Sequence, residues 1–83
     1  MQPKVKLYTL STCIHCKNAK KFLNDCNVKY EFQDVDLLSG KEREEMFDEI
    51  RKINADCSFP TIVIGDRVIA GFKEQEIREA LGL

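Results

Sequence analysis

Two cysteines separated by two residues, Cys13 and Cys16, limit both the fold and the chemistry of this chain. They lie where a strand-like sequence pattern gives way to a helical one. In residues 4–9, Val5, Leu7 and Thr9 alternate with Lys4, Lys6 and Tyr8, which is the period of a β-strand. The β-branched and aromatic residues of this segment also favour a strand. From residue 14 to residue 26 the apolar positions recur every three or four residues, which is typical of an amphipathic helix. The sequence therefore predicts a strand, a short turn and a helix with Cys13 at its N-terminal edge.

A cysteine at the start of a helix is favourably placed for nucleophilic chemistry. The thiolate is the reactive form, and unpaired backbone N–H groups and the positive end of the helix dipole stabilise an anion there. Cys16 is one turn further along, close enough to attack a mixed disulfide formed at Cys13, and it shares the apolar face of the helix with Ala19 and Leu23. We therefore predict that Cys13 is the attacking thiol and Cys16 the more buried, resolving thiol.

His15 lies between the two cysteines and has two interpretations of equal standing. A protonated imidazole would stabilise the thiolate or change the redox potential of the pair, whereas a solvated side chain on the first helical turn would do neither. Zinc is a minor alternative, because it would require Cys13, His15 and Cys16 to point to one centre together with Cys57. We expect no metal at this site.

Length and composition limit the number of domains, the classes of binding partner and the cellular compartment. A chain of 83 residues is predicted to form one domain, residues 1–83, with a single small core. Lys and Arg number 13 and Asp and Glu 14, interspersed along the chain, so nothing indicates binding to nucleic acid or to a membrane. The N-terminal segment predicts neither a signal peptide nor a transmembrane span. Four cysteines without a secretory signal indicate reduced thiols, so we expect a cytoplasmic protein. We also expect a monomer.

The middle of the chain predicts a second strand and a second helix. Residues 30–35 favour a strand, and two strands joined by a helix of this length form a β-α-β unit with parallel strands and a right-handed crossover. Ser39 and Glu42 fit a capping box, in which the Ser39 side chain accepts a hydrogen bond from a backbone N–H of the next helix. The apolar stripe of that helix is predicted to contain Met46, Phe47, Ile50 and Ile53.

The last third of the chain predicts a hairpin and a terminal helix. An apolar, β-branched run at residues 59–64 is separated by Gly65-Asp66 from a second short run at residues 67–70. A helix over residues 73–81 follows, with three residues expected to face inward: Ile77, Ala80 and Leu81. The predicted order of elements is β-α-β-α-β-β-α.

Pro60, in the first turn of the third predicted strand, marks a second candidate site. It has two interpretations, since a proline there is either an ordinary edge-strand residue or part of a cis peptide bond. A cis bond would turn the Phe59 backbone outward beside the cysteine pair, where an extended substrate would pair with it as an added strand.

Three features occur in an order that resembles the glutaredoxin branch of the thioredoxin-like fold over nearly the whole chain: the C-x-x-C after the first strand, the proline before the third strand, and Gly71 just after the fourth. The resemblance implies an α/β fold with a four-stranded mixed sheet and helices on both faces. It implies that Pro60 is cis. Residues at the substrate groove are then expected to be Thr12, Cys13, Phe59 and Pro60, to which we add His15 and Gly71 as candidate substrate-binding residues.

The resemblance also implies an activity. Glutaredoxins are thiol-disulfide oxidoreductases that reduce protein or mixed disulfides by dithiol exchange, have no tightly bound cofactor and use glutathione as a co-substrate. Three positions depart from their common pattern: Ile14-His15 replaces Pro-Tyr, Leu10 replaces a lysine, and Ser58-Phe59-Pro60 replaces Thr-Val-Pro. The first functional hypothesis is therefore a thiol-disulfide oxidoreductase that acts through Cys13 and Cys16, with the choice between glutathione and a thioredoxin reductase as electron source left open.

A fourth departure favours one of those alternatives. Ala70-Gly71-Phe72-Lys73 stands where glutaredoxins have a Gly-Gly-x-Asp-Asp segment, and it resembles small redoxins that deliver electrons to ribonucleotide reductase and receive them from a thioredoxin reductase. The simpler interpretation is that Gly71 permits a turn and Phe72 packs on the core. A non-catalytic module that binds peptide or metal is a third possibility.

The two remaining cysteines receive separate predictions. Cys26 lies on the apolar stripe of the first helix and is predicted to be a small core residue. Cys57 lies three residues before Pro60, where it is either a passive loop thiol or a partner in a regulatory mixed disulfide.

Overall fold

The computed structural model describes residues 2–83, so Met1, the first residue of the predicted domain, lies outside the described part. The strands are β1 (Val5–Thr9), β2 (Glu31–Asp34), β3 (Thr61–Ile64) and β4 (Arg67–Ala70). The helices are α1 (Ile14–Asp25), α2 (Gly40–Ile53) and α3 (Glu74–Leu81), with a short 3-10 helix, η1 (Val35–Leu37). The predicted order β-α-β-α-β-β-α is confirmed, and η1 is an addition that the sequence patterns did not indicate.

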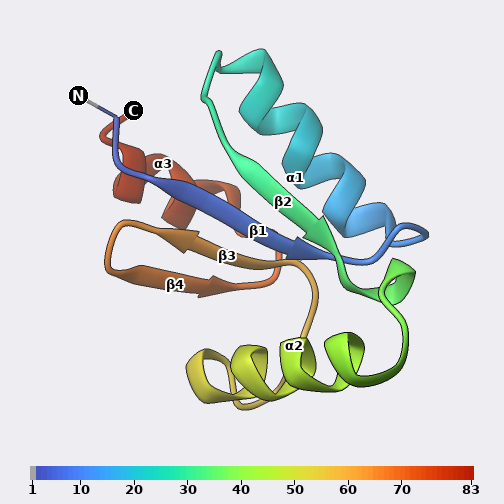
Figure 1. The fold of residues 1–83 in the computed structure, drawn as a ribbon. Helices are drawn as coiled ribbons and strands as arrows, with labels where there is room; N and C mark the ends of the chain where they lie inside the picture. Colours follow the sequence, from blue (N-terminus) through green and yellow to red (C-terminus); the bar gives the residue numbers. More distant parts are fainter. Residues whose placement is uncertain (1) are drawn as a thin grey trace.

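The four strands form one mixed sheet in the order β2-β1-β3-β4. Strand β1 is parallel to β2 and antiparallel to β3, and β3 and β4 form the predicted hairpin (Figure 1). Because β1 and β3 are antiparallel neighbours, the chain leaves β1 toward Cys13 at the same end of the sheet at which it enters β3 from Pro60. The topology alone therefore brings the two candidate sites to one end of the sheet.

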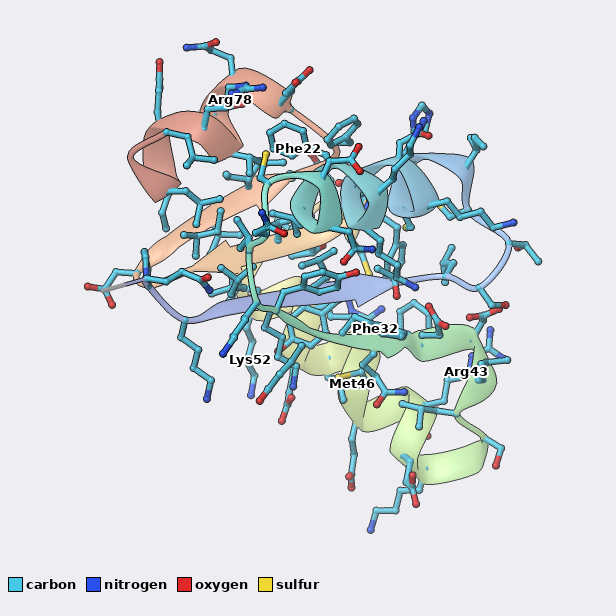
Figure 2. All side chains as sticks on the ribbon, turned by 90° about the horizontal axis from the view of Figure 1, so that it is seen from above. Phe22, Phe32, Arg43, Met46, Lys52 and Arg78 are labelled. Atoms are coloured by element: carbon cyan, nitrogen blue, oxygen red, sulfur yellow. The ribbon has the colours of Figure 1, made fainter. Side chains whose placement is uncertain are left out.

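Helices α1 and α3 cover one face of the sheet and α2 covers the other (Figure 1). Figure 2 shows the same layers, with Phe22 and Arg78 on the side of α1 and α3 and Met46 on the side of α2. Alternation along β1 follows the prediction, since Val5, Leu7 and Thr9 are buried. The main core cluster lies between β1, β3, β4 and the first of these helix layers: Val5, Leu7, Ala19, Leu23, Val28, Ile62, Ile64, Ile69 and Ile77.

The start and end of α2 differ from the prediction. Ser39 occupies the N-cap position, but its side chain makes no capping hydrogen bond, so the predicted capping box is wrong in this respect. The reason is local, because Gly40 follows with a φ of +58° and the first turn lacks the geometry that a capping box requires. Ile53, predicted to lie on the buried stripe, is 43% exposed in the last turn of α2, whereas Ile50 is fully buried.

Helix α1 ends at Asp25, and a left-handed turn follows it. Asn27 adopts a φ of +57°, the left-handed conformation that asparagine tolerates better than most residues, directly after the C-cap Cys26. The Val28 N–H then donates to the Leu23 carbonyl at 2.9 Å, which closes the helix end and directs the chain into β2. This reversal fixes where β2 pairs with β1.

Candidate active site

The turn between β1 and α1 is held by hydrogen bonds within the turn and from outside it. Within the turn, the Cys13 N–H donates to the Leu10 carbonyl at 3.1 Å. From outside, the Asp36 carboxylate in η1 accepts from the Ser11 N–H at 2.8 Å and from the Ser11 hydroxyl. These bonds from Ser11 favour the ionised carboxylate and hold the pKa of Asp36 below its usual value. The segment that presents Cys13 is thus fixed to η1.

Cys13 is the N-cap residue of α1. Its backbone is extended, with φ −83° and ψ 119°, and its Sγ accepts a hydrogen bond from the Cys16 N–H at 3.3 Å. The sulfur therefore occupies the position that an N-cap side-chain oxygen usually takes, among helix N–H groups with no partner inside the helix. Cys13 is partly exposed, so the sulfur is accessible to another disulfide.

Cys16 is fully buried on the apolar face of α1. Burial, followed by a hydrogen bond with Cys13, raises the pKa of Cys16 to about 12. Among the other influences, the negative charge of a Cys13 thiolate raises that pKa further and the positive charge of Lys20 lowers it. The two cysteines thus have different environments, because one thiol faces solvent at a helix N-terminus and the other is protonated behind it.

The other candidate residues on either side of Cys13 are exposed to solvent. Thr12 and His15 are both exposed, and Ile14 between the cysteines is 62% exposed. Within residues 2–83 the structure has no group of three or more His, Cys, Asp or Glu side chains arranged to hold a metal ion.

The Phe59-Pro60 peptide bond is cis, which confirms the expectation that the resemblance carried. Pro60 is buried, and its carbonyl accepts a hydrogen bond of 2.7 Å from the Gly71 N–H. Gly71 has a φ of +89°, a conformation that side-chain-bearing residues rarely adopt. The structure therefore brings the predicted residues Pro60 and Gly71 into direct contact, and the Gly71 amide is occupied by this bond.

A buried polar network fixes the loop that leads to Pro60. Asn54 is 7% exposed, and its amide donates to the Ser58 Oγ at 3.1 Å and the Thr61 Oγ1 at 3.0 Å. The Thr61 hydroxyl in turn donates to the Ser58 carbonyl at 2.7 Å. These bonds join the end of α2 to the start of β3 on either side of Phe59-Pro60.

Phe59 is half-buried and packs edge-on against Phe47 of α2, with ring centroids 6.0 Å apart. Phe47, predicted on the apolar stripe of α2, therefore packs against the residue that precedes Pro60. Phe72 packs against Phe22 at a centroid distance of 6.0 Å beside the main core, in agreement with the simpler of its two interpretations.

The remaining cysteines are both partly exposed. Cys26 packs against the edge of the main core cluster, close to its prediction as a small core residue. Cys57 lies in the loop before Pro60 with a φ of +49°, and its N–H donates to the Asn54 carbonyl at 2.9 Å.

Sequence reasoning missed the residues that support the site from a distance. Asn54 and Asp36 carry no local motif, and they meet their partners only through the tertiary fold. A third supporting group is the ion pair between Lys20 and Asp34, with Nζ and Oδ1 3.4 Å apart. The lysine appeared in the sequence only as one of several charges on the polar side of α1, and nothing in that pattern separates it from its neighbours.

Comparison with known proteins agrees with this geometry. A family model described as Glutaredoxin matches residues 5–69. An uncharacterized glutaredoxin-like 8.6 kDa protein in the rubredoxin operon of Clostridium pasteurianum is 36% identical over 74 residues, which cover 88% of this chain and 91% of the relative.

Solved structures give the same result. The methanoredoxin of Methanosarcina acetivorans superposes with a TM-score of 0.92 at 42% identity and covers 99% of this chain and 87% of that one. A glutaredoxin from Methanosarcina mazei Go1 has a TM-score of 0.88 at 50% identity, with 98% and 80% of the two chains covered. The predicted thioredoxin-like architecture is confirmed.

Proposed function

This chain belongs to the glutaredoxin family, whose general activity is thiol-disulfide oxidoreduction, and from that premise we propose that it reduces disulfides by dithiol exchange through Cys13 and Cys16. The observation that supports this most directly is the position of the Cys13 Sγ, which caps α1 and accepts the Cys16 N–H. A thiolate is stabilised at such a position, and a second thiol stands one turn behind it. Protein disulfides and mixed disulfides are the proposed substrates.

The proposed cycle has two exchange steps. The Cys13 thiolate attacks one sulfur of the substrate disulfide, a bond forms between them, and the other substrate sulfur leaves with the electron pair and takes a proton from solvent. Cys16 then loses its proton to solvent and attacks the Cys13 Sγ. The Cys13–Cys16 disulfide forms and the second substrate thiolate is expelled. The substrate disulfide gains two electrons, and the two cysteines lose them.

The Phe59-Pro60 segment is the proposed docking edge for the substrate. Proline has no N–H, and its carbonyl is taken by Gly71, so hydrogen bonds to an extended substrate would come from the Phe59 backbone. Thr12 and His15, both exposed beside Cys13, are the proposed contacts on the opposite side of the groove. In this proposal Gly71 acts by holding Pro60.

Glutathione is the proposed co-substrate that returns oxidised Cys13 and Cys16 to the dithiol. A thioredoxin reductase is the second candidate donor, and the observation that favours it is Leu10. This apolar residue stands where a lysine for the glutathione carboxylate is usual in the family, and it is half-buried beside the cysteine pair. The structure contains no membrane-crossing helix among the described residues. We propose the cytoplasm as the site of action, because a dithiol reductant requires a reducing compartment.

The test follows NADPH consumption while the protein reduces a small disulfide, with glutathione and glutathione reductase in one reaction and thioredoxin reductase alone in another. Turnover with either system supports the proposed activity and identifies the donor. Cys13→Ser is expected to abolish turnover in both. Turnover by Cys13→Ser at the wild-type rate would contradict the assignment of the nucleophile, and turnover with neither reductase would contradict the proposed function.

A matched variant tests the resolving thiol. Cys16→Ser is expected to stop after the first step and accumulate a mixed disulfide at Cys13, which mass spectrometry of the intact protein detects. Cys26→Ser and Cys57→Ser are the controls, and we expect both to turn over without such an adduct. If Cys16→Ser accumulates no adduct, the dithiol route is wrong.

A further inference from the structure

Lys20 differs from the other lysines of α1 because it is largely enclosed. Its side chain is 22% exposed, whereas Lys17 and Lys21 are exposed residues. Its Nζ lies 3.4 Å from the Asp34 carboxylate and 3.8 Å from the ring centroid of Phe32, which Figure 2 labels on β2. An ammonium held between a carboxylate and an aromatic face has little positional freedom, and its field is screened less by salt than that of an exposed lysine.

Asp34, which holds Lys20, is itself fixed by the sheet. It pairs in register with Thr9 at the ends of the parallel strands β2 and β1, and its side chain is 16% exposed. The Thr9 hydroxyl, fully buried, donates to the Asp34 Oδ1 at 2.5 Å. Thr9 is the last residue of β1 before the active-site turn. The Thr9 hydroxyl therefore fixes the Asp34 carboxylate at the end of β2, and this carboxylate in turn fixes the position of Lys20.

The enclosed lysine shares one side of α1 with the resolving cysteine. Lys20 is four residues after Cys16 on α1, so the two side chains lie one helical turn apart on the same side. The titratable groups whose charges act on Cys16 are Cys13 from the active-site turn and Lys20 from its own helix, with Asp34 of β2 paired to Lys20. Lys20 is the cation among them.

We propose that Lys20, anchored by Asp34 and Thr9, is a positioning residue for the resolving step, in which its charge stabilises the Cys16 thiolate that attacks the mixed disulfide at Cys13. The proton leaves Cys16 for solvent water, the S–S bond between Cys16 and Cys13 forms, and the bond from Cys13 to the substrate sulfur breaks. The expelled substrate thiolate carries the electron pair away. Lys20 forms no covalent bond and exchanges no electrons in this step. This inference rests on the proposed dithiol exchange.

The role matters because Cys16 is a poor acid. Burial is the largest of the causes that raise the pKa of the Cys16 thiol, so at neutral pH the thiolate is a rare species and any group that stabilises it accelerates resolution. The first step uses the Cys13 thiolate and does not require ionisation of Cys16. A loss of the Lys20 charge is therefore expected to slow the second step selectively, which a general loss of structure would not do.

The experiment measures the two steps separately by rapid mixing, acid quench and mass spectrometry, with bis(2-hydroxyethyl) disulfide as the probe. Formation of the Cys13 adduct reports the first step, and loss of the adduct reports the second. Lys20→Met removes the charge and keeps the apolar stem, Lys20→Arg restores the charge, and Lys21→Met makes the same change at an exposed neighbour. If Lys20→Met does not fold, Lys20→Gln replaces it.

Lys20→Met is expected to leave adduct formation within about twofold of wild type and to slow resolution about three- to tenfold at pH 7, because a nearby opposite charge shifts a pKa by up to a few units. Its resolution rate rises with pH along a curve displaced to higher pH. Lys20→Arg is expected to recover most of the rate, and Lys21→Met to match wild type.

Three results would overturn the inference: equal resolution rates in Lys20→Met and Lys21→Met, an equal slowing of both steps, or no displacement of the pH profile. These outcomes leave the proposed function standing when the wild type still forms and resolves its adduct. A wild type that forms no adduct at Cys13 would overturn the proposed function, and this inference with it.

Discussion

The network around Asn54 predicts a measurable loss of stability when its amide is removed. Asn54→Ala takes away two well-formed donor bonds, to the Ser58 Oγ at 3.1 Å and the Thr61 Oγ1 at 3.0 Å, inside a buried site. Each such bond contributes about 1 kcal/mol net, and the partners have little access to water, so we expect a loss of about 2 kcal/mol. For a domain of this size that corresponds to a fall in Tm of about 8–15 °C.

The assay is reversible unfolding in urea, followed by circular dichroism, with a thermal melt as the second measurement. Asn24→Ala is the matched control, because Asn24 is exposed on α1 and alanine favours a helix. We expect that control to change stability by less than about 0.5 kcal/mol. A double-mutant cycle with Thr61→Val is expected to give a coupling energy of about 1 kcal/mol. Equal stabilities of Asn54→Ala and Asn24→Ala, or a coupling of zero, would refute the network's role.

Three further expectations follow from single residues. Iodoacetamide at pH 8 should leave Cys16 of the folded, reduced protein unmodified, because with a pKa of about 12 only about one molecule in ten thousand carries that thiolate; prompt labelling of Cys16, located by peptide mapping, would contradict its environment. The hydrogen bonds from Ser11 lower the pKa of Asp36, so these bonds are fully present above the ordinary pKa of about 4 and are lost as pH falls through the lower pKa of the folded state. The Ser11 amide resonance should therefore keep its chemical shift at pH 4. A transition of that resonance above pH 4 would show that the pKa of Asp36 is not lowered. Gly71→Ala meets no atom within 4 Å but must adopt a φ of +89°, so we expect a loss of about 1–2 kcal/mol in urea unfolding, and unchanged stability would show that the backbone there relaxes freely.

The fold was predictable where local patterns suffice. Alternation in residues 4–9, the three-to-four spacing after Cys13 and the Gly65-Asp66 turn each report on a few neighbouring residues, and each element formed as expected. The errors fell where a neighbour overrides the pattern. Ser39 has the right spacing to Glu42, but the left-handed Gly40 between them prevents the capping bond. Ile53 fits the apolar stripe of α2 and is exposed because it is the last residue of that helix.

In the candidate site too, residues marked by a local motif could be predicted, whereas residues that depend on the tertiary fold could not. Cys13, Cys16, Pro60 and Gly71 are visible in the sequence because a short motif or a special backbone residue marks each of them. The residues that hold the site are not visible, since their partners are distant in sequence. Ser11 and Asp36 are 25 residues apart, as are Thr9 and Asp34. Such contacts depend on the register of β1 with β2, which no single segment determines.

A peptide map of the protein after reaction with one equivalent of a small disulfide shows directly which cysteines become oxidised. Trypsin cleavage after Lys6 and Lys17 leaves Cys13 and Cys16 in one peptide, while Cys26 and Cys57 fall in two others. If Cys13 and Cys16 are the redox pair, the peptide of residues 7–17 is found two hydrogen atoms lighter, with Cys26 and Cys57 still reduced. A disulfide joining Cys13 to the peptide of Cys26 or Cys57, or a peptide 7–17 that stays fully reduced, would contradict this assignment.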